Sequence, residues 1–326
     1  MKLYIIGNGF DIAHEIKTSY WNFRCYMERY AEDFLLEFEK LYGFYPFDPD
    51  DYHITQKMQK KVIKLREESL YHELWKSFEL GLGQPDEGEI QSFCDSAVES
   101  LQDLESGPVQ IEDTLNECFD EQFRFVEKLQ KYLLLWIKQV RLHKAMVKKK
   151  ELLNNHDDLF LTFNYTPTLE RIYHISPSQI CHIHGGIPPY CTELPVIGHG
   201  NRAEIESRRK MQKECDEVFD EGGASINKAF ADFYQRTYKN TDQAMQRNIY
   251  FFDRIKGVEE IIVIGHSLGN VDIPYFSEIL NRAGIEKMWT IYYHCESEIV
   301  DMEQSIRAIG IINYRLAPSS GFWDLG

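Results

Sequence analysis

The sequence predicts an α/β fold in which a parallel sheet carries a large helical insertion. Short apolar runs of strand length alternate with segments of helical spacing, which is typical of parallel α/β sheets. Between residues 21 and 150 the strand pattern gives way to helical spacing alone. We therefore expect a core formed by residues 1–20 and 151–326, interrupted by a helical insertion at 21–150.

The first predicted strand, Lys2–Ile6, runs directly into the turn Gly7-Asn8-Gly9. Glycines in such a turn let backbone N–H groups approach a ligand, and the N-terminus of a following helix favours bound phosphate. The turn therefore indicates a nucleotide-binding site. Ile12 stands where the dinucleotide fingerprint has its third glycine, so an ordinary tight turn between strand and helix is the alternative.

The predicted insertion at 21–150 shows apolar residues at three- and four-residue spacing, which indicates amphipathic helices. Its charges are segregated along the chain. Residues 86–121 hold twelve acidic side chains and no Lys or Arg, whereas 138–150 is basic and ends in Lys148-Lys149-Lys150. Two interpretations stay open: these are solvated helix faces, or the two stretches pair between subunits of a homo-oligomer.

Strand signals return after Lys150. The strands predicted there cover residues 158–163, 178–183, 194–197, 260–264, 287–293 and 311–316, with a helical segment near 202–250. In open parallel sheets, ligands bind beyond the carboxyl ends of the strands. The residues that follow the strands are therefore the candidates for a binding or catalytic site.

Two polar residues at strand ends are candidates for catalysis. Asn164 directly follows a predicted strand, and its amide can serve a donor and an acceptor at once, although an Asx turn before Pro167 would also explain it. His184 lies between a strand and a Gly-Gly turn, where it would suit a general base at neutral pH. A structural role for His184 is the alternative, and His182 is the second candidate.

The segment Gly265–Gly269 fits the Gly-x-Ser-x-Gly pattern of a nucleophile elbow, with Ser267 as the nucleophile. Only His294 lies downstream of Ser267, and the acids between them are poorly placed to orient it, which disfavours a serine hydrolase. The same segment has a second interpretation. The Ser267 hydroxyl and the glycine amides would hold phosphate or ribose, and Asp272 would accept hydrogen bonds from ribose hydroxyls.

The composition excludes some classes of partner. With 36 Lys and Arg against 52 Asp and Glu, the net charge of −16 argues against broad binding to nucleic acid or an anionic membrane. No apolar run approaches the roughly 18 residues that a membrane span needs, and the N-terminal run is too short for a signal peptide. We expect a cytoplasmic protein.

The seven cysteines are odd in number, scattered and without a Cys-x-x-Cys pair, as in a reduced cytoplasmic protein. The only local cluster combines Cys181, His182, His184 and Cys191. Because the paired spacing of structural zinc ligands is missing there, no metal site is predicted.

Several motifs, in order along the chain, resemble the AbiH family of bacterial proteins associated with abortive infection, in which an infected cell arrests or dies before phage can spread. They are Asn8-Gly9-Phe10-Asp11, Lys17-Thr18-Ser19-Tyr20, Trp75-Lys76-Ser77-Phe78-Glu79, Thr162-Phe163-Asn164-Tyr165-Thr166, His182-Ile183-His184-Gly185 and Gly265-His266-Ser267-Leu268-Gly269. The resemblance runs from Ile5 to about Tyr275 and implies a role in defence against phage.

The same landmarks are more distantly similar to the sirtuin-like NAD-binding fold. The residues that match its glycine turn, Thr-x-Asn strand end, His-Gly turn and Gly-x-Ser strand end are Gly7, Gly9, Asn164, His184, Gly265 and Ser267. The chain departs from that pattern at Asn8, where a small residue is usual, and at Thr166, where an acid is usual. It also lacks a four-cysteine zinc module, which disfavours protein deacylation. The resemblance implies that NAD is bound and, on activation, hydrolysed.

In that role Asn164 would position a water or the ribose hydroxyls, and His184 would take a proton from one of them. The residues implied in holding the nucleotide are Gly7, Asn8, Gly9, Asp11, Thr18, Gly265, Ser267 and Asp272. The expected partners are NAD or a related nucleotide, a second copy of the chain, and a phage-derived trigger or partner protein. A nucleotide sensor without turnover, acting through a partner, is the first alternative, and the serine hydrolase is the second.

Overall fold

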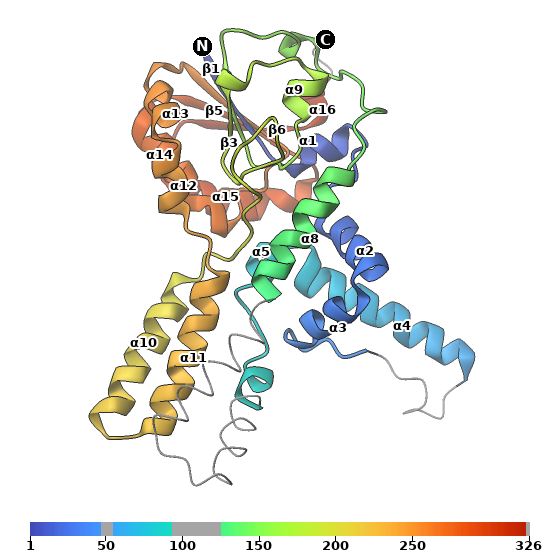
Figure 1. The fold of residues 1–326 in the computed structure, drawn as a ribbon. Helices are drawn as coiled ribbons and strands as arrows, with labels where there is room; N and C mark the ends of the chain where they lie inside the picture. Colours follow the sequence, from blue (N-terminus) through green and yellow to red (C-terminus); the bar gives the residue numbers. More distant parts are fainter. Residues whose placement is uncertain (47–54, 93–124, 324–326) are drawn as a thin grey trace. The chain divides into compact units, whose positions relative to one another are not determined.

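The computed structural model describes residues 1–46, 55–92 and 125–323 (Figure 1). Backbone contacts divide the chain into two compact units, each assembled from separate stretches of sequence. Unit 1 contains Met1–Asn22, Leu133–Val196 and Asn240–Gly326, and unit 2 contains Phe23–Tyr132 and Ile197–Lys239. The boundary within the 21–150 segment therefore lies at Leu133, and a second stretch, Ile197–Lys239, belongs to the same unit as the first part of that segment.

Unit 1 is built on a six-stranded sheet in which every neighbouring pair is parallel. Its strands are β1 (Lys2–Ile6), β2 (Leu159–Thr162), β3 (Ile180–His182), β4 (Glu260–Ile264), β5 (Met288–Tyr293) and β6 (Tyr314–Pro318). The order across the sheet is β3-β2-β1-β4-β5-β6. This is a Rossmann-like order, and its direction reverses between β1 and β4. The prediction of a Rossmann-like parallel α/β sheet is confirmed.

One strand predicted from the sequence does not form. Residues 194–197 make a loop, which is fixed where the Val196 N–H donates to the His184 carbonyl at 2.8 Å and the Tyr165 hydroxyl donates to the Val196 carbonyl at 2.9 Å. Pro195 has no N–H to give to a strand ladder, which explains why the apolar residues there do not join the sheet. The last strand is also displaced, since β6 begins at Tyr314 and not at Ile311.

Helices cover both faces of the sheet in unit 1, because successive strand residues point to opposite sides. Leu3 and Ile5 pack with α13 (Ile249–Arg254), α14 (Ile273–Ala283) and α15 (Ile299–Ile309). Tyr4 and Ile6 pack with α1 (Asn8–Ala13), α9 (Thr168–Ile172) and α16 (Ser320–Trp323). Figure 1 shows these two sets of helices on opposite sides of the strands. The remaining helix of this unit is α12 (Thr241–Arg247).

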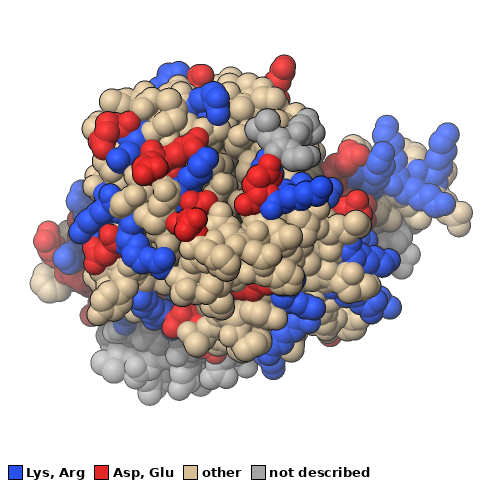
Figure 2. Space-filling model, turned by 90° about the horizontal axis from the view of Figure 1, so that it is seen from above, with Lys and Arg blue, Asp and Glu red and all other residues tan. Residues whose placement is uncertain are grey.

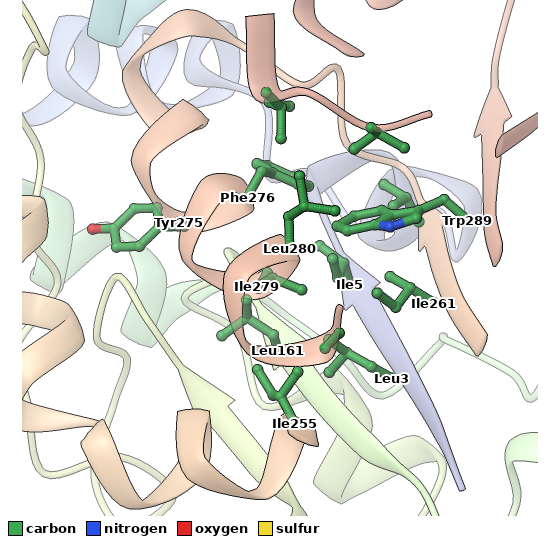
Figure 3. Packing of buried hydrophobic residues seen from close by; sticks show 14 of the residues in the cluster. Leu3, Ile5, Leu161, Ile255, Ile261, Tyr275, Phe276, Ile279, Leu280 and Trp289 are labelled. Atoms are coloured by element: carbon green, nitrogen blue, oxygen red, sulfur yellow. The ribbon is translucent and has the colours of Figure 1, made fainter. Parts of the chain in front are cut away.

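The larger of the two cores lies under α14. Figure 3 shows Phe276, Ile279 and Leu280 of α14 directed toward Trp289 and the apolar side chains of β1, β2 and β4, while Tyr275 lies on another side of the helix. Apolar residues recur at three- and four-residue spacing along α14, so one stripe of this helix is buried on the sheet. This packing fixes the start of α14, where Asp272 lies, relative to the strand ends.

The described residues of unit 2 form helices joined by turns and loops, with one isolated bridge between His199 and Tyr238. The unit contains α3 (Glu32–Lys40), α4 (Gln56–Leu70), a π-helical turn η2 (Tyr71–Trp75), α5 (Phe78–Gly81), α10 (Arg202–Glu217) and α11 (Glu221–Thr237). Two further helices, α2 (Tyr20–Tyr30) and α8 (Phe125–Gln139), continue from one unit into the other. Where they are described, residues 21–139 and 202–250 are mostly helical, whereas residues 140–149 form turns and loops. Most of the acidic stretch 86–121 lies outside the described residues.

The core of unit 2 combines aromatic rings with one buried charge network. Phe38 packs against the rings of Trp75, Phe78 and Phe125 at centroid distances of 5.7–5.9 Å. Beside them Glu39 is fully buried and accepts hydrogen bonds from Arg24 Nε at 2.7 Å and from the indole N–H of Trp75 at 3.0 Å. A buried carboxylate needs such partners, because leaving it unpaired would cost several kcal/mol, about 3–5 in typical cases.

The surface carries both signs of charge. Figure 2 shows Lys and Arg interspersed with Asp and Glu over the described surface that faces the viewer. Among residues 1–46, 55–92 and 125–323, no helix combines the length and the apolar character needed to cross a membrane.

Candidate functional site

The strand register aligns the residues that follow β1, β2, β3 and β4. Ile6 pairs with Thr162 on one side and with Ile264 on the other, and Thr162 pairs with His182. The residues two positions beyond these strand ends therefore follow at the same edge of the sheet. They are Asn8, Asn164, His184 and His266. Two of the four, Asn164 and His184, are the predicted catalytic residues.

Three glycines allow the turns after β1 and β4 to touch through their backbones. Gly7 N–H donates to the Ile264 carbonyl at 3.0 Å, and Gly9 N–H donates to the Gly265 carbonyl at 2.8 Å. A Cβ on Gly9 would lie 2.7 Å from Gly265 Cα, and a Cβ on Gly7 or Gly265 would meet backbone atoms even more closely. Gly265 also has a φ of +70°, which favours glycine. This contact accounts for all three glycines, and their role in holding a nucleotide stays a prediction.

Thr18, in the segment that follows helix α1, fixes a side chain of the first turn, Gly7-Asn8-Gly9. Thr18 Oγ1 donates a hydrogen bond to Asn8 Oδ1 at 2.6 Å. These two predicted nucleotide contacts are thus brought together in the fold. The bond fixes the Asn8 side chain at the start of α1, a helix of six residues.

Asn164 is buried at the end of β2, and its amide is oriented by a backbone group of the first turn. Its Nδ2 donates to the Gly7 carbonyl at 3.1 Å, and because the carbonyl can only accept, the nitrogen of the amide must lie on that side. The other amide atom, Oδ1, is buried, and no described residue donates a hydrogen bond to it. Asn164 therefore presents an unused acceptor at the edge of the sheet.

Asp11 is fully buried and lies against the loop that carries Asn164. Thr168 Oγ1 donates to Asp11 Oδ1 at 2.7 Å, and the Thr166 hydroxyl donates to Asp11 Oδ2. Burial raises the pKa of Asp11 from 3.8 to about 6, although the threonine hydrogen bonds act in the opposite direction. The carboxyl group thus ties α1 to the start of α9. A direct contact of Asp11 with a nucleotide stays a prediction.

His182 supports the same loop from β3. Its Nδ1 lies 3.1 Å from the Asn164 carbonyl, which can only accept, so Nδ1 carries a proton and donates. Its Nε2 lies 2.8 Å from Oε1 of Glu170, on the buried side of α9. Both ring nitrogens are therefore engaged inside the protein, and His182 holds the backbone of Asn164 in place.

The contacts of His182 and Cys191 disfavour a zinc site in the cluster of Cys181, His182, His184 and Cys191. Both nitrogens of His182 are engaged, and Cys191 Sγ is directed to the carbonyl of Glu193 at 3.4 Å. Burial raises the pKa of the Cys181 thiol, which opposes the thiolate that zinc binds. The residues of this segment fit a structural role better than a metal site.

Asp272, just before α14, lies between two histidines of the strand ends. His184 Nε2 lies 3.2 Å from Asp272 Oδ1, and His266 Nε2 lies 3.3 Å from Asp272 Oδ2. All three side chains are buried. The predicted catalytic residue His184 and the predicted ribose ligand Asp272 are thus brought together, in the arrangement by which a carboxylate orients a histidine base.

Aromatic rings enclose this histidine pair. The ring of Phe163 meets His184 edge-on at a centroid distance of 4.9 Å and His266 at 4.3 Å. Tyr275 lies 5.6 Å from His184. Packing on rigid apolar rings restricts how the imidazoles can rotate, so their nitrogens face Asp272 in a defined way.

The turn after β4 does not have the geometry of a nucleophile elbow. Ser267 is exposed, and the residue with the left-handed backbone is its neighbour Leu268, with a φ of +58°. Helix α14 starts only at Ile273, after the 3-10 turn η6 (Asn270–Asp272). In a nucleophile elbow the serine itself occupies the strained position between strand and helix. The exposed hydroxyl of Ser267 remains available to a ligand.

Sequence reasoning did not single out several residues that the structure places at the site, namely His266, Thr166, Thr168 and Glu170. His266 could have been found from its position, because it stands two residues beyond a strand end, as Asn164 and His184 do. The partners of Asp11 depend on the pairing of β1 with β2, which the local sequence does not encode.

In a comparison with family models, the chain matches the model described as Bacteriophage abortive infection AbiH over residues 3–293. The matched range includes β1 to β5 and every residue of the site described above. No curated protein gives a match. No solved structure gives a match either.

Proposed function

This chain belongs to the AbiH family of bacteriophage abortive infection proteins. From its more distant similarity to the sirtuin-like NAD-binding fold, we propose that it acts on NAD at the carboxyl edge of the sheet in unit 1. In this proposal the turns after β1, β2, β3 and β4 hold NAD, and the activated protein hydrolyses the bond between nicotinamide and ribose. Loss of NAD would stop metabolism, which would arrest an infected cell before phage can spread.

The observation that carries the proposal is the buried, unused oxygen of Asn164. A buried polar atom without a partner costs about 1–3 kcal/mol, so proteins retain few of them without a reason. Because Nδ2 is held by the Gly7 carbonyl, Oδ1 faces away from the first turn as an acceptor. Ribose hydroxyls and an attacking water are donors that this oxygen suits.

The strand order supports the same location. In Rossmann-like sheets, nucleotides bind where the strand order reverses, which in this chain is between β1 and β4. The residues that gather at that edge include an amide, a histidine and a carboxylate. This combination can bind hydroxyl groups and move a proton.

Hydrolysis of the bond between nicotinamide and ribose needs few catalytic groups. The bond between ribose C1′ and the nicotinamide nitrogen breaks through an oxocarbenium-like state, as in glycoside hydrolysis, and a water oxygen bonds to C1′. Nicotinamide leaves as a neutral molecule because its ring nitrogen carries positive charge beforehand, so no general acid is required. His184, oriented by Asp272 at 3.2 Å, would take the proton that the water loses.

The remaining predicted contacts have supporting roles in this proposal. Ser267 would bind a ribose or phosphate oxygen through its exposed hydroxyl. The hydrogen-bonded pair Asn8 and Thr18 would lie beside the phosphates of NAD. Asp11 would act by holding Thr166 and Thr168, and with them the loop of Asn164. The glycines of the first and fourth turns, Gly7, Gly9 and Gly265, would let the nucleotide approach the backbone.

The test is to incubate purified protein with NAD, in extracts of infected and uninfected cells, and to quantify released nicotinamide by chromatography. Asn164→Ala and His184→Ala should each abolish nicotinamide release and toxicity while the circular dichroism spectrum is unchanged. Ser267→Ala should weaken NAD binding by about 1–2 kcal/mol, as for one lost hydrogen bond, without stopping turnover.

His294→Ala is the matched control, because His294 is an exposed histidine beyond the end of β5. It should hydrolyse NAD as the wild type does. A folded His184→Ala protein that releases nicotinamide at the wild-type rate would remove His184 from the mechanism. NAD binding without release of nicotinamide in either extract would favour the nucleotide sensor, and labelling of Ser267 by a fluorophosphonate probe would favour the serine hydrolase.

The proposal includes a homo-oligomer and a phage-derived trigger, since an NAD hydrolase that is always active would kill its host. The basic segment 138–150 is the described half of the suggested contact between subunits. Within it Lys148 and Lys150 are exposed, whereas Lys149 is buried beside the ring of Phe322 at 5.4 Å. Charge reversal at Lys148 and Lys150 therefore probes subunit association without disturbing the packing of Lys149.

A further inference from the structure

One carboxylate serves two buried histidines at the edge of the sheet. Asp272 Oδ1 lies 3.2 Å from His184 Nε2, and Asp272 Oδ2 lies 3.3 Å from His266 Nε2. The two histidines come from different strands, β3 and β4. The mechanism proposed above uses His184 and Asp272 and leaves His266 without a role.

The backbone fixes the tautomer of His266. The N–H of Leu268 donates to His266 Nδ1 at 2.9 Å, so Nδ1 is the acceptor and carries no proton. The proton of the neutral ring is then on Nε2, where it points to Asp272.

The conformation of Leu268 shows that this turn is held under strain. Leu268 is buried and has a φ of +58°, a backbone conformation that is unfavourable for a residue with a branched side chain. The hydrogen bond from its N–H to His266 and the burial of its side chain offset that cost. The turn after β4 therefore holds His266 in one position, with Nδ1 as the acceptor for Leu268 N–H.

We propose that His266 is a positioning residue for His184. Its Nε2–H donates to Asp272 Oδ2 and turns the carboxylate so that Oδ1 faces His184 Nε2. His184 then carries its own proton on Nε2, and Nδ1 is its basic nitrogen. The effect on turnover rests on the proposed function, whereas the tautomer of His184 can be measured whether or not NAD is the substrate.

Two substitutions separate the two contacts of His266. In His266→Asn the side-chain oxygen replaces Nδ1 as the acceptor for Leu268 N–H, since an Asn accepts naturally from the residue two positions on, but nothing reaches Asp272. In His266→Gln the longer side chain places its NH₂ near the position of Nε2 and can donate to Asp272, but the acceptor for Leu268 is lost. The first variant tests positioning and the second tests the turn.

The measurement is nuclear magnetic resonance of protein labelled with ¹⁵N in its histidines, which distinguishes the two neutral tautomers. In the wild type, both His184 and His266 should carry the proton on Nε2. In His266→Asn the His184 ring should lose its single tautomer, and in His266→Gln it should keep it while the melting temperature falls. Where NAD is turned over, kcat should fall about tenfold in His266→Asn with KM little changed, and His266→Gln should recover most of it.

A wild-type His266 with its proton on Nδ1 would overturn the proposal directly. So would a folded His266→Asn protein in which His184 keeps the wild-type tautomer. If neither form of the protein hydrolyses NAD but the His184 tautomer changes as described, the positioning role stands and the proposed reaction fails. If NAD is hydrolysed and kcat, KM and tautomer are all unaffected by His266→Asn, the reaction stands and the positioning role fails.

Discussion

Asp11 gives the fold a stability that depends on pH in an unusual direction. Its pKa is about 6 in the folded protein because burial disfavours the charged form, against 3.8 for an exposed aspartate. The unfolded chain therefore loses this proton at lower pH than the folded protein does. The stabilising contribution is complete below about pH 4 and is lost as the pH rises through about 6.

The size of the effect follows from that difference. A shift of about two pKa units corresponds to about 3 kcal/mol between acidic and alkaline conditions, of which about 1–2 kcal/mol remains to be lost between pH 5 and pH 8. In Asp11→Asn this dependence disappears, while an amide of the same shape can still accept from one threonine and donate to the other. Relative to the wild type, the variant should gain about 1–2 kcal/mol as the pH is raised from 5 to 8.

Urea-induced unfolding, followed by circular dichroism at several values between pH 5 and pH 8, measures this difference. Comparing two proteins at each pH removes the contributions of all other titrating groups, because they are common to both. A difference in unfolding free energy that stays constant across this range would refute the reasoning. It would mean that Asp11 is ionised at pH 5 in spite of its burial, or that water reaches it.

Two further predictions concern stability and are measured by thermal unfolding. Gly265→Ala should destabilise the protein by more than about 1–2 kcal/mol, since its φ of +70° is unfavourable for alanine and a Cβ would collide with Phe10 N. Gly269→Ala should be tolerated, because its Cβ would meet only the Ser267 hydroxyl at 3.8 Å, an ordinary contact. Glu39→Gln should cost about 3–5 kcal/mol because it breaks a buried ion pair, whereas Glu28→Gln, which removes an exposed partner of the same arginine, should cost under about 1 kcal/mol. Equal effects within either pair of variants would contradict these explanations.

The sequence predicted most strands because buried parallel strands appear as short apolar runs between turns. Residues 260–264 form β4 as predicted, and β1 coincides with its predicted run. The prediction at 194–197 was wrong because an apolar run alone does not show whether its N–H groups can pair, and Pro195 lacks one. The order of the strands could not be predicted from the sequence, because β2 and β4, the neighbours of β1 in the sheet, lie far from it along the chain.

The site was predictable only where its residues follow strands directly. Asn164 and His184 were found in that way, and the structure brings His184 to Asp272 at 3.2 Å. His266 was missed because the Gly-x-Ser-x-Gly pattern draws attention to Ser267, although His266 follows its strand just as His184 does. The contact between the two glycine turns could not be predicted, because the sequence does not show that Gly265 lies against Gly9.

The scattered origin of the sheet also sets the order in which its carboxyl edge can assemble during synthesis. Strand β1 is made before both of its neighbours, β2 beginning at Leu159 and β4 beginning at Glu260. The edge that carries Asn164 and His184 gains its carboxylate only once Asp272 has also been made. A nascent chain that stops before Asp272 therefore lacks the assembled edge, so the reaction proposed there cannot begin on it.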